Sequence, residues 1–444
     1  MPSSEHDLGI EGGTLVCGRG QEVTNVYIRD GRVAEVTNET RAARERVDAS
    51  GLLVMPGFVD VHVHFMDPGD PSREDFISGT AAAARAGVTT VIEHTHGSPV
   101  RAAADLARKT EYLSDRSRVD FALGAHAWPG HVEDVASVWD AGAAFIKAFT
   151  CTTHGVPGHN AAALLDLLEA VASADATCLL HCEDESITEA AGARLRAAGR
   201  VDGAVITEWR SRAAEQVAVA VAGVLARRTG ARAILAHASS VEVLDLAAGL
   251  LVESCPQYLS LLEVEATEQG PFRKFTPPAR AMSTGSLDLM WEAVRAGRID
   301  YVSSDHAPST RAQKSGGSIW EVPFGLPGVD TTSAVLLEGA HAGRLSYERV
   351  VEVYAEAPAR LYGLKQKGHL VAGADADLSL VDPAAAWTVS DEDILSRAGW
   401  SPFSGKTFHG RPRKTFLRGQ VAARDGIVVA APGRGQFIAG PGSR

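Results

Sequence analysis

The sequence has few cysteines, a deficit of basic side chains and no long apolar run. Five cysteines in 444 residues are an odd, sparse set, so no disulfide framework is predicted. The most apolar stretch, residues 217–226, is far shorter than the roughly 20 residues that span a bilayer. The N-terminus has no basic segment followed by an apolar one, so no secretory signal is predicted. We therefore expect a cytoplasmic protein without a membrane partner.

Acidic side chains outnumber basic ones, 55 against 43, which gives a formal net charge of −12. Nucleic acids and anionic membranes bind basic surfaces, so this balance argues against both kinds of partner. The apolar share of 45% is enough for a large core and excludes wholesale disorder.

Two β-rich ends flank a long middle segment. An Asp-Gly pair at residues 30–31 and another at 425–426 each separate two short β-patterned segments, which predicts a hairpin at either end. We predict a small β-sandwich domain built from both ends, residues 1–55 plus 364–444, and a catalytic barrel over residues 56–363. The tail from residue 431, rich in Gly and Pro, is interpreted as a loose arm or a subunit contact.

The middle segment alternates short apolar runs with helical patterns. Parallel strands need helical crossovers, so eight βα units predict an α/β fold of the (β/α)8 TIM-barrel type. The predicted strands are 58–65, 88–94, 119–125, 143–149, 176–182, 231–237, 250–255 and 300–305. Helical patterns between them cover 74–86, 99–113, 161–172, 207–228, 241–248 and 283–296.

Polar residues gather at the carboxyl ends of these strands. That end of a TIM barrel forms the active-site mouth, so side chains far apart in the sequence are expected to converge there. The residues concerned are His62, His64, Lys147, His181, His237 and Asp305.

His62 and His64 lie two residues apart on the first strand, so both imidazoles face the same way, as does Asp60. Two neutral imidazoles at this spacing can bind one metal ion, with Asp60 placed behind them to orient a ligand. Taken alone, the pair could equally decorate a strand end. Within Pro56-Gly-Phe-Val-Asp-Val-His-Val-His-Phe it favours a metal site.

Lys147 lies in the apolar run Phe-Ile-Lys-Ala-Phe, where a bare ammonium is expensive to bury. A closed barrel has no edge from which its amine could reach water, so a neutral nucleophilic amine is expected. Such an amine can take up CO₂ as a carbamate, which is able to bridge two metal ions.

His181 and His237 each end an apolar strand. A lone histidine of this kind is more often a core residue, but two on adjacent strands facing one rim favour metal binding. Asp305 could be a turn or N-cap residue, and its place on the last strand favours a ligand and general base.

These residues resemble the cyclic amidohydrolases of the amidohydrolase superfamily: dihydroorotases, allantoinases, hydantoinases and dihydropyrimidinases. The resemblance covers nearly the whole chain. Beyond the first strand, its motifs are Cys255-Pro-Gln-Tyr-Leu, Pro277-Pro-Ala-Arg, Ser304-Asp-His-Ala-Pro, Ala357-Pro-Ala-Arg-Leu-Tyr-Gly-Leu, Gly373-Ala-Asp-Ala-Asp-Leu and Ser401-Pro-Phe-Ser-Gly.

The resemblance implies two divalent metal ions. His62, His64 and Asp305 would hold the more buried ion, and His181 and His237 the second. A carboxylated Lys147 would bridge them. Zinc is the expected metal, with manganese as the alternative. A hydroxide shared by the ions would attack the carbonyl of a cyclic amide, with Asp305 as general base and then acid.

The substrate-contacting positions depart from the dihydroorotase pattern. Dihydroorotases usually carry His-x-His-x-Arg and an Asn after strand two, which together grip a substrate carboxylate, whereas Met66 and His96 stand at these places here. Gln257 resembles hydantoinases, while the loop around Phe324 resembles dihydroorotases and allantoinases. We predict a neutral cyclic ureide or imide as the substrate, contacted by these four residues. Met66 and Phe324 suggest an apolar pocket for an aryl or alkyl substituent. Three further histidines lie on loops at the expected mouth of the barrel: His94, His154 and His159. Each could either select the substrate or be an exposed loop residue without a role in the site.

Three alternatives compete with an allantoinase- or hydantoinase-like enzyme. One is a dihydroorotase, disfavoured by Met66 and His96. Another is a non-catalytic, dihydropyrimidinase-like scaffold, disfavoured because all six ligand positions are filled. The third is a different two-metal barrel hydrolase, disfavoured by the Cys-Pro-Gln-Tyr and Pro-Pro-Ala-Arg segments. Members of the resembling family are commonly dimers or tetramers, so a homodimer or homotetramer is expected.

Overall fold

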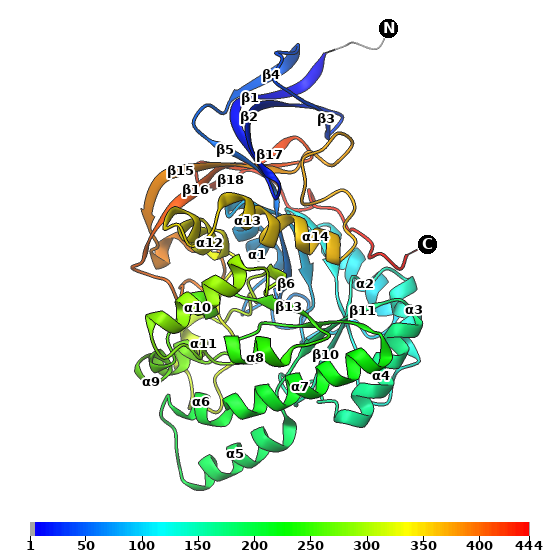
Figure 1. Cartoon of the computed structure of the whole chain (residues 1–444), viewed down its shortest axis with the longest axis vertical. Coiled ribbons are helices and arrows are strands. Elements are labelled where there is room, and N and C mark those ends of the chain that lie inside the picture. Colours follow the sequence, from blue (N-terminus) through cyan, green and yellow to red (C-terminus); the bar gives the residue numbers. More distant parts are fainter. Residues whose placement is uncertain (1–4, 444) are drawn as a thin grey trace.

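Both ends of the chain contribute strands to one nine-stranded sheet, which lies above the barrel in Figure 1. The computed structural model describes residues 5–443. The sheet order is β18-β17-β16-β15-β5-β1-β2-β3, with β4 paired to β1. Its strands are β1 (His6–Cys17), β2 (Gly20–Arg29), β3 (Arg32–Thr37), β4 (Ala43–Asp48), β5 (Leu53–Pro56), β15 (Leu378–Thr388), β16 (Thr407–Leu417), β17 (Gln420–Arg424) and β18 (Ile427–Val428).

The two predicted hairpins are confirmed. Asp30 and Gly31 join β2 to β3, and Asp425 and Gly426 join β17 to β18. All four residues have positive φ, between 48° and 83°, which is the backbone that a two-residue hairpin turn of the primed type requires.

The barrel strands follow the predicted order, each shorter than its predicted range. They are β6 (Phe58–Val63), β7 (Val88–Glu93), β8 (Asp120–Leu123), β9 (Ala125–His126), β10 (Ile146–Phe149), β11 (Thr177–His181), β12 (Arg232–Leu235), β13 (Leu251–Ser254) and β14 (Tyr301–Val302). β8 and β9 are two parts of one predicted strand, interrupted at Gly124. The barrel closes where His64 N donates to His306 O at 2.7 Å, which joins the first strand to the segment after the last.

Helices cover the outside of the barrel (Figure 1). The helices longer than nine residues are α1 (Phe76–Arg85), α2 (Ala103–Ser114), α4 (Ala161–Ser173), α5 (Glu185–Ala197), α7 (Arg212–Thr229), α10 (Thr284–Arg295) and α12 (Thr332–His341). Shorter ones are α3 (Asp134–Asp140), α6 (Val205–Trp209), α8 (Val241–Leu246), α9 (Val264–Gln269), α11 (Arg311–Ser315), α13 (Tyr347–Val351), α14 (Ala357–Leu361), the 3₁₀-helices η1 (Pro256–Leu259), η2 (Gly270–Arg273) and η4 (Asp391–Asp393), and the π-helix η3 (Glu352–Glu356). Within residues 5–443, no helix has the length and apolar character needed to cross a bilayer.

One predicted helix, residues 207–228, is divided in the structure. α6 ends at Trp209 and α7 begins at Arg212, because Arg210 leaves the helical conformation and the Ser211 side chain caps the second helix. This break turns Arg210 inward, where its guanidinium donates to Glu183 Oε2 at 3.2 Å.

Apolar side chains fill the interior of the barrel. Val59, Val61 and Ile92 pack there with residues of the later strands, and all three are inaccessible to solvent. Gly57, between β5 and β6, has no room for a side chain, because a Cβ would lie 2.2 Å from Thr89 Oγ1. The glycine therefore lets the nine-stranded sheet lead directly into the first barrel strand.

The C-terminal tail is not a loose arm, so this part of the interpretation was wrong, while the alternative of a subunit contact stays a prediction. Phe121 N donates to Gln436 O at 2.9 Å, and Ile438 N donates to Phe121 O at 2.7 Å, so the tail lies along β8. A Cβ on Gly435 would lie 1.8 Å from Val119 O. Glycine is thus present in the tail because the backbones approach closely, and its abundance does not indicate disorder.

A buried ion cluster links the barrel to the nine-stranded sheet. The Lys367 amine lies 2.7 Å from Asp377 and 2.9 Å from Asp375, and it also pairs with Asp120 at the start of β8. Burial lowers and the three carboxylates raise the pKa of Lys367, with a net rise. The lysine is therefore charged, and it shares the neutralisation of these carboxylates with Arg418, which pairs with Asp120, and Arg32, which lies 3.6 Å from Asp375.

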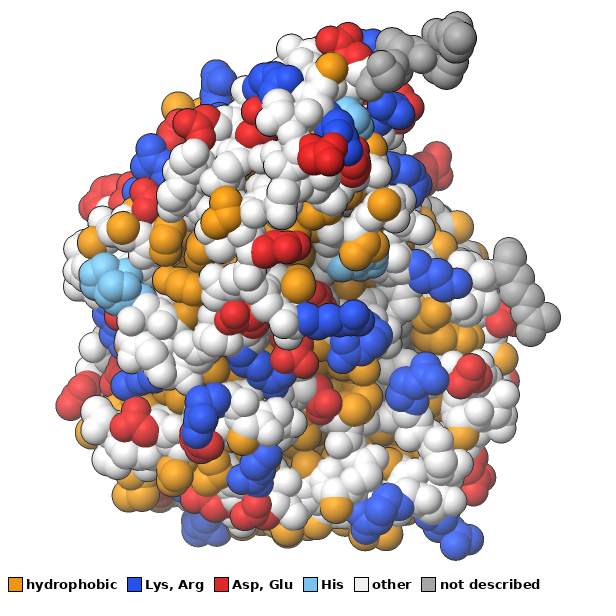
Figure 2. Space-filling model, turned by 45° about the horizontal axis from the view of Figure 1, so that its top comes forward, with side chains coloured by type: hydrophobic (Ala, Val, Ile, Leu, Met, Phe, Trp, Pro, Cys, Tyr) orange, Lys and Arg blue, Asp and Glu red, His pale blue; other side chains and the backbone are white. Residues whose placement is uncertain are grey.

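The surface carries both signs of charge. On the face shown in Figure 2, acidic and basic side chains are interspersed, with apolar patches between them. The charge on this face is therefore spread out and does not gather into one patch.

Candidate active site

All six predicted ligand residues line one cavity at the carboxyl ends of the barrel strands. They come from the ends of β6, β10, β11, β12 and β14, and they are His62, His64, Lys147, His181, His237 and Asp305. The remaining lining is His96, Phe149, His154, Phe275, Thr276, Ala307, Phe324 and Gly325. The barrel thus brings these side chains together as expected, and their binding of a metal ion stays a prediction.

His62 and His64 each use one ring nitrogen as a hydrogen-bond donor and leave the other free. His62 Nδ1 lies 2.9 and 3.1 Å from the two carboxylate oxygens of Glu253, and His64 Nδ1 lies 3.1 Å from the carbonyl oxygen of His94. The free Nε2 atoms lie 3.3 and 3.7 Å from Asp305 Oδ1. A histidine whose second nitrogen is held by a carboxylate or a carbonyl is typical of a metal ligand.

His181 and His237 form a second converging pair. His181 Nδ1 lies 2.9 Å from His237 Nε2, and the other nitrogen of His181 lies 2.8 Å from Glu183 Oε2. Burial alone would raise the pKa of Glu183, but Arg210 and His181 lower it to about 2, so Glu183 is an ionised acceptor. Glu183 therefore fixes the ring of His181 with Nδ1 directed at His237.

Lys147 is a buried amine without a hydrogen-bond partner among the described residues. Its side chain is 1% exposed, and burial lowers the pKa of the amine. An isolated ammonium would be costly here, so the environment favours a neutral amine or a modified one. This matches what the sequence predicts, while the carbamate stays a prediction.

Two acidic residues, Asp60 and Glu253, lie next to the predicted ligand histidines on the side away from the cavity, and only Asp60 was predicted from the sequence. Asp60 accepts from the backbone N of Ser304 at 3.0 Å and from the hydroxyl of Tyr354 at 3.0 Å, and it does not reach either imidazole. The side chain that holds the His62 ring is Glu253 on β13, which also accepts from the backbone N of His237 at 2.9 Å. The sequence did contain a signal for the role of Glu253. It is a glutamate inside the apolar strand 250–255, and a buried carboxylate needs hydrogen-bond partners.

The backbone is strained at four positions around the cavity. Met66, His154, His237 and Asp305 have φ values of 60°, 56°, 43° and 47°, a region that non-glycine residues adopt rarely. Such conformations cost about 1–3 kcal/mol each and cluster at functional sites. Two of the four positions, His237 and Asp305, are predicted ligands, so strain falls where strand ends turn side chains into the cavity.

Histidines and aromatic rings surround the mouth of the cavity. The rings of His96 and His154 are stacked, with centroids 4.4 Å apart and an interplanar angle of 7°. Phe324 lies edge-on to His154 at 6.0 Å, and the amine of Lys274 lies 4.4 Å from the centroid of Phe324. His96 and Phe324 thus line the cavity, and their contact with a substrate stays a prediction.

The other two predicted substrate contacts do not belong to the residues that line the cavity. Met66 is buried, and its sulfur accepts from Thr95 Oγ1 at 3.3 Å. Gln257 is buried in η1, where its backbone carbonyl oxygen accepts a hydrogen bond from Leu261 N at 2.9 Å. His159 is also buried, and its Nδ1 donates to Phe149 O. Met66, Gln257 and His159 therefore lie outside the cavity lining, and substrate contact by Met66 and Gln257 stays a prediction.

Among the described residues, no arginine lines the cavity. Two guanidinium groups lie beside the lining residue Phe324. Arg210 is engaged by Glu183 and Cys151, and Arg73 donates to Phe324 O at 3.3 Å and to Pro308 O at 3.0 Å. The lining therefore offers imidazole and aromatic groups at the mouth and no bidentate partner for a substrate carboxylate.

The donor set fits divalent metal ions. Four imidazoles and one carboxylate converge with the buried amine of Lys147, and both this amine and His237 Nδ1 lack a hydrogen-bond partner within residues 5–443. Nitrogen and oxygen donors of this kind suit zinc and similar ions. Three of these histidines belong to groups whose ligand atoms lie within 4.8 Å of one another: His62 and His64 together with His94, and His181 together with Glu183 and Cys151.

Comparisons with known proteins agree with this geometry. A family model described as "Amidohydrolase family" matches residues 53–422. A dihydroorotase of Halobacterium salinarum is 35% identical over 93% of this chain and 98% of its own length. An allantoinase of Rubrobacter xylanophilus is 35% identical over 98% of each chain. The solved structure of an L-hydantoinase (dihydropyrimidinase) from Arthrobacter aurescens superposes with a TM-score of 0.93 at 31% identity, covering 98% of this chain and 100% of the other.

Proposed function

Because the chain belongs to the amidohydrolase family, as a cyclic amidohydrolase of the hydantoinase, allantoinase and dihydroorotase group, we propose that it opens a neutral cyclic ureide or imide. In this reaction water adds to a ring carbonyl and the ring C–N bond breaks. The nitrogen takes up a proton, and the carbonyl carbon becomes a carboxylate. Allantoinase-like or hydantoinase-like hydrolysis is the form of this reaction that we favour.

The observation that carries the choice of a neutral ring is the absence of an arginine from the cavity lining of the described chain. A substrate carboxylate buried without a charge partner would lose a charge-assisted hydrogen bond of about 1.5–3 kcal/mol. The stacked His96 and His154 stand at the mouth instead. A neutral imidazole can donate a hydrogen bond to a ring carbonyl and accept one from a ring N–H, so these histidines can bind a ring amide that carries no negative charge.

Dihydroorotate hydrolysis is the second candidate. It is favoured by the relative from Halobacterium salinarum, which is as similar to this chain, at 35% identity, as the allantoinase is. An anionic ring would then rely on histidines at the mouth or on Lys274, whose amine lies behind Phe324 and donates to Val322 O at 2.6 Å. Because this amine is already engaged with backbone carbonyls, we place the anionic substrate second.

The metal ions would be held as the sequence predicts. His62, His64 and Asp305 would bind one ion, His181 and His237 the other, and carboxylated Lys147 would bridge them. When bound, such a pair lowers the pKa of a water molecule towards 7 and polarises the ring carbonyl.

The residues of the chain supply positioning and proton transfer. Asp305 faces the cavity from the last strand, 3.3 Å from His62 Nε2, so its carboxylate can accept a proton from the attacking water. The same carboxyl group can return this proton to the leaving ring nitrogen. Phe149, Phe275 and Phe324 give the cavity an apolar wall, which suits an aryl or alkyl substituent on the ring.

A panel of ring substrates tests the proposal. The zinc- or manganese-loaded protein is assayed with hydantoin, allantoin, dihydrouracil, dihydroorotate and a simple imide. We expect at least one neutral ring to exceed dihydroorotate in kcat/KM by about 10-fold or more, as the loss of a charge-assisted contact implies. Fastest turnover of dihydroorotate would refute the neutral-ring proposal, and turnover of none would refute the function.

Two further comparisons sharpen this test. Asp305→Asn keeps the shape of the side chain and removes its basicity, so it should be folded and inactive on every substrate. A preference for 5-phenylhydantoin over unsubstituted hydantoin is expected from the aromatic wall. Equal rates on the two hydantoins would remove the apolar pocket from the proposal.

A further inference from the structure

His94 is a fully buried histidine whose two ring nitrogens have no hydrogen-bond partner among the described residues. It follows directly after β7, and it was open in the sequence between a substrate contact and a surface position. Leaving a buried polar group unsatisfied costs about 1–3 kcal/mol, so a buried histidine without partners requires an explanation. Its burial excludes a plain surface position, and it does not line the cavity mouth with His96 and His154.

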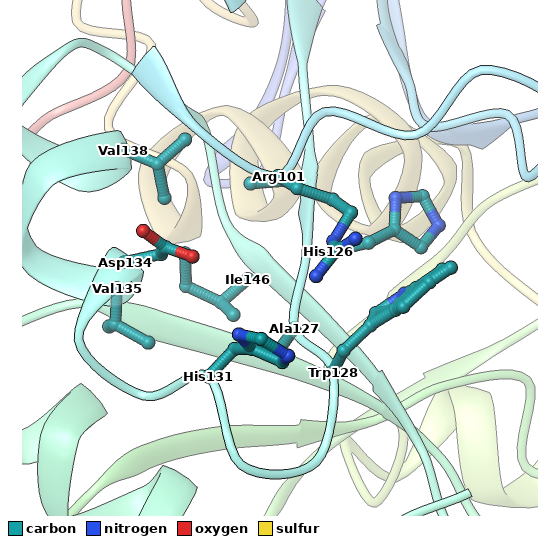
Figure 3. A pocket seen from close by; sticks show the side chains of 10 residues that line it. Arg101, His126, Ala127, Trp128, His131, Asp134, Val135, Val138 and Ile146 are labelled. Atoms are coloured by element: carbon teal, nitrogen blue, oxygen red, sulfur yellow. The ribbon is translucent and has the colours of Figure 1, made fainter. Parts of the chain in front are cut away.

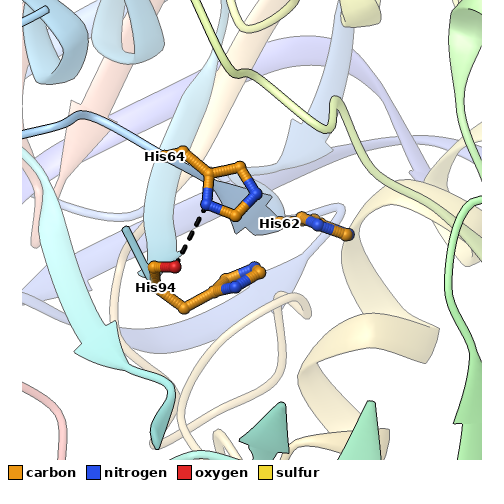
Figure 4. A group of neighbouring side chains, drawn as sticks. All are labelled: His62, His64 and His94. Atoms are coloured by element: carbon orange, nitrogen blue, oxygen red, sulfur yellow. Dashed lines mark hydrogen bonds between the residues drawn. The ribbon is translucent and has the colours of Figure 1, made fainter. Parts of the chain in front are cut away.

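The side chain of His94 points at the His-x-His pair. A ring nitrogen of His94 lies within 4.8 Å of one nitrogen of His62 and one nitrogen of His64. The ring centroids are 4.6 Å from that of His62 and 4.3 Å from that of His64. Figure 4 shows the three imidazoles gathered around a common space, with the His94 carbonyl holding Nδ1 of His64.

Packing alone does not explain why this residue is a histidine. The ring lies edge-on to Phe145 at 5.0 Å, a contact that a phenylalanine or a methionine could make equally well. An apolar side chain there would leave no unsatisfied nitrogen. The imidazole is favoured over an apolar ring only if one of its nitrogens binds a ligand, and His62 and His64 each place a ring nitrogen within 4.8 Å of it.

We propose that His94 is a third imidazole ligand of the metal ion held by His62 and His64. This inference rests on the metal-binding site of the proposed function and adds a residue to it. Imidazole nitrogen suits zinc, cobalt and nickel, whereas carboxylate and water oxygen suit manganese. The third imidazole therefore makes this position selective for zinc-like ions over manganese.

The test compares His94→Phe with a matched control, His126→Phe. His126 is also a buried histidine, neither of its nitrogens has a partner in the described part of the chain, and its ring lies 6.0 Å from that of His94. It borders a smaller cavity together with Arg101 and Trp128 (Figure 3), its ring lies 5.6 Å from that of His96, and it belongs to neither proposed metal position. Both substitutions replace an imidazole by a ring of similar shape.

Zinc affinity is measured by chelator competition, and metal selectivity by the zinc-to-manganese ratio after dialysis against equal concentrations of both ions. X-ray absorption at the zinc edge gives the average number of imidazoles per zinc. His94→Phe should weaken zinc binding at the position of His62 and His64 at least about 10-fold, because even residues that only hydrogen-bond to a metal ligand change metal affinity by that factor. It should also lower the zinc-to-manganese ratio and the imidazole number. His126→Phe should match the wild type in all three measurements.

Unchanged zinc affinity and imidazole number in a folded His94→Phe protein would overturn the inference. Circular dichroism and urea unfolding establish folding, and His94→Met serves the same test if the phenylalanine variant does not fold. These readouts do not use activity. One outcome is that the wild type binds two zinc ions and hydrolyses its ring substrate while His94→Phe binds zinc equally well. That result would refute only the role of His94 as a metal ligand and would leave the proposed function intact. A wild type that binds no metal would refute the metal-dependent function as well.

Discussion

Replacing Glu253 by glutamine removes one negative charge from behind the metal site and keeps the shape of the side chain. In the structure this carboxylate accepts from His62 Nδ1 through both oxygens, from His237 N at 2.9 Å, and from the hydroxyl of Ser303. A glutamine has one oxygen and one amino group in place of two acceptors. The Ser303 hydroxyl can reverse and accept from the amino group, so the oxygen can keep its bonds to His62 and His237.

The expected loss follows from these contacts. A hydrogen bond to a charged group contributes about 1.5–3 kcal/mol and one to a neutral group about 0.5–1.5 kcal/mol, so each of the two retained bonds weakens by about 1–1.5 kcal/mol. The weaker bond at Nδ1 makes Nε2 of His62 a poorer metal donor. Partners of this kind are worth about 10- to 100-fold in metal affinity, which corresponds to roughly 1.4–2.8 kcal/mol and agrees with the contact-based figure.

The assay has two parts and one control. Chelator competition measures zinc affinity, and urea unfolding of the metal-free protein measures stability. Asp330→Asn is the control, because Asp330 is also a buried carboxylate that accepts from two backbone nitrogens and pairs with Arg85, away from the cavity. We expect both variants to lose stability, and only Glu253→Gln to lose zinc affinity. Equal zinc affinity in Glu253→Gln and the wild type would show that Glu253 only stabilises the fold.

Three further perturbations test other parts of the structure. Lys147→Ala should abolish metal retention and turnover, which metal analysis and the ring assay measure; an active variant with two metals per chain would contradict the bridging role. Burial lowers the pKa of Lys274 to about 8, below its unfolded value near 10.4, so the unfolded state binds more protons between these pH values. Stability of the wild type should therefore rise from pH 8 to 10.5 by up to about 3 kcal/mol from this group, and Lys274→Met should lack that rise in urea unfolding. Lys367→Met leaves buried carboxylates without their cation and should lower the free energy of unfolding by about 3–5 kcal/mol, and an unchanged unfolding midpoint would show that the cluster is not needed for stability.

The sequence predicted the barrel and the composition of the site because both depend on local patterns. The alternation of apolar runs with helical stretches determines the βα units. A polar residue that ends an apolar strand, such as His181 or Lys147, is visible without knowing its neighbours. The Asp-Gly turns at residues 30–31 and 425–426 were equally local, and both are confirmed.

Composition was a poor guide where the chain packs against itself. The high glycine content of the tail predicted a loose arm. Gly435 is instead required to be glycine, because a backbone carbonyl of the barrel lies where its side chain would be. The single predicted helix over 207–228 is divided at Arg210, whose guanidinium has a buried partner in Glu183. In each case a contact distant in the sequence overrode the local signal.

The amino-acid sequence by itself determined the fold class and the six residues that meet at the cavity, because period, strand ends and turn residues are written locally. Only the tertiary structure decided which atoms of those residues are free to bind. Glu253 reaches His62 across 191 positions, and His94 turns towards the His-x-His pair only because the barrel sets β7 beside β6. Such partners are fixed by the closure of the sheet, a long-range event that no local pattern encodes.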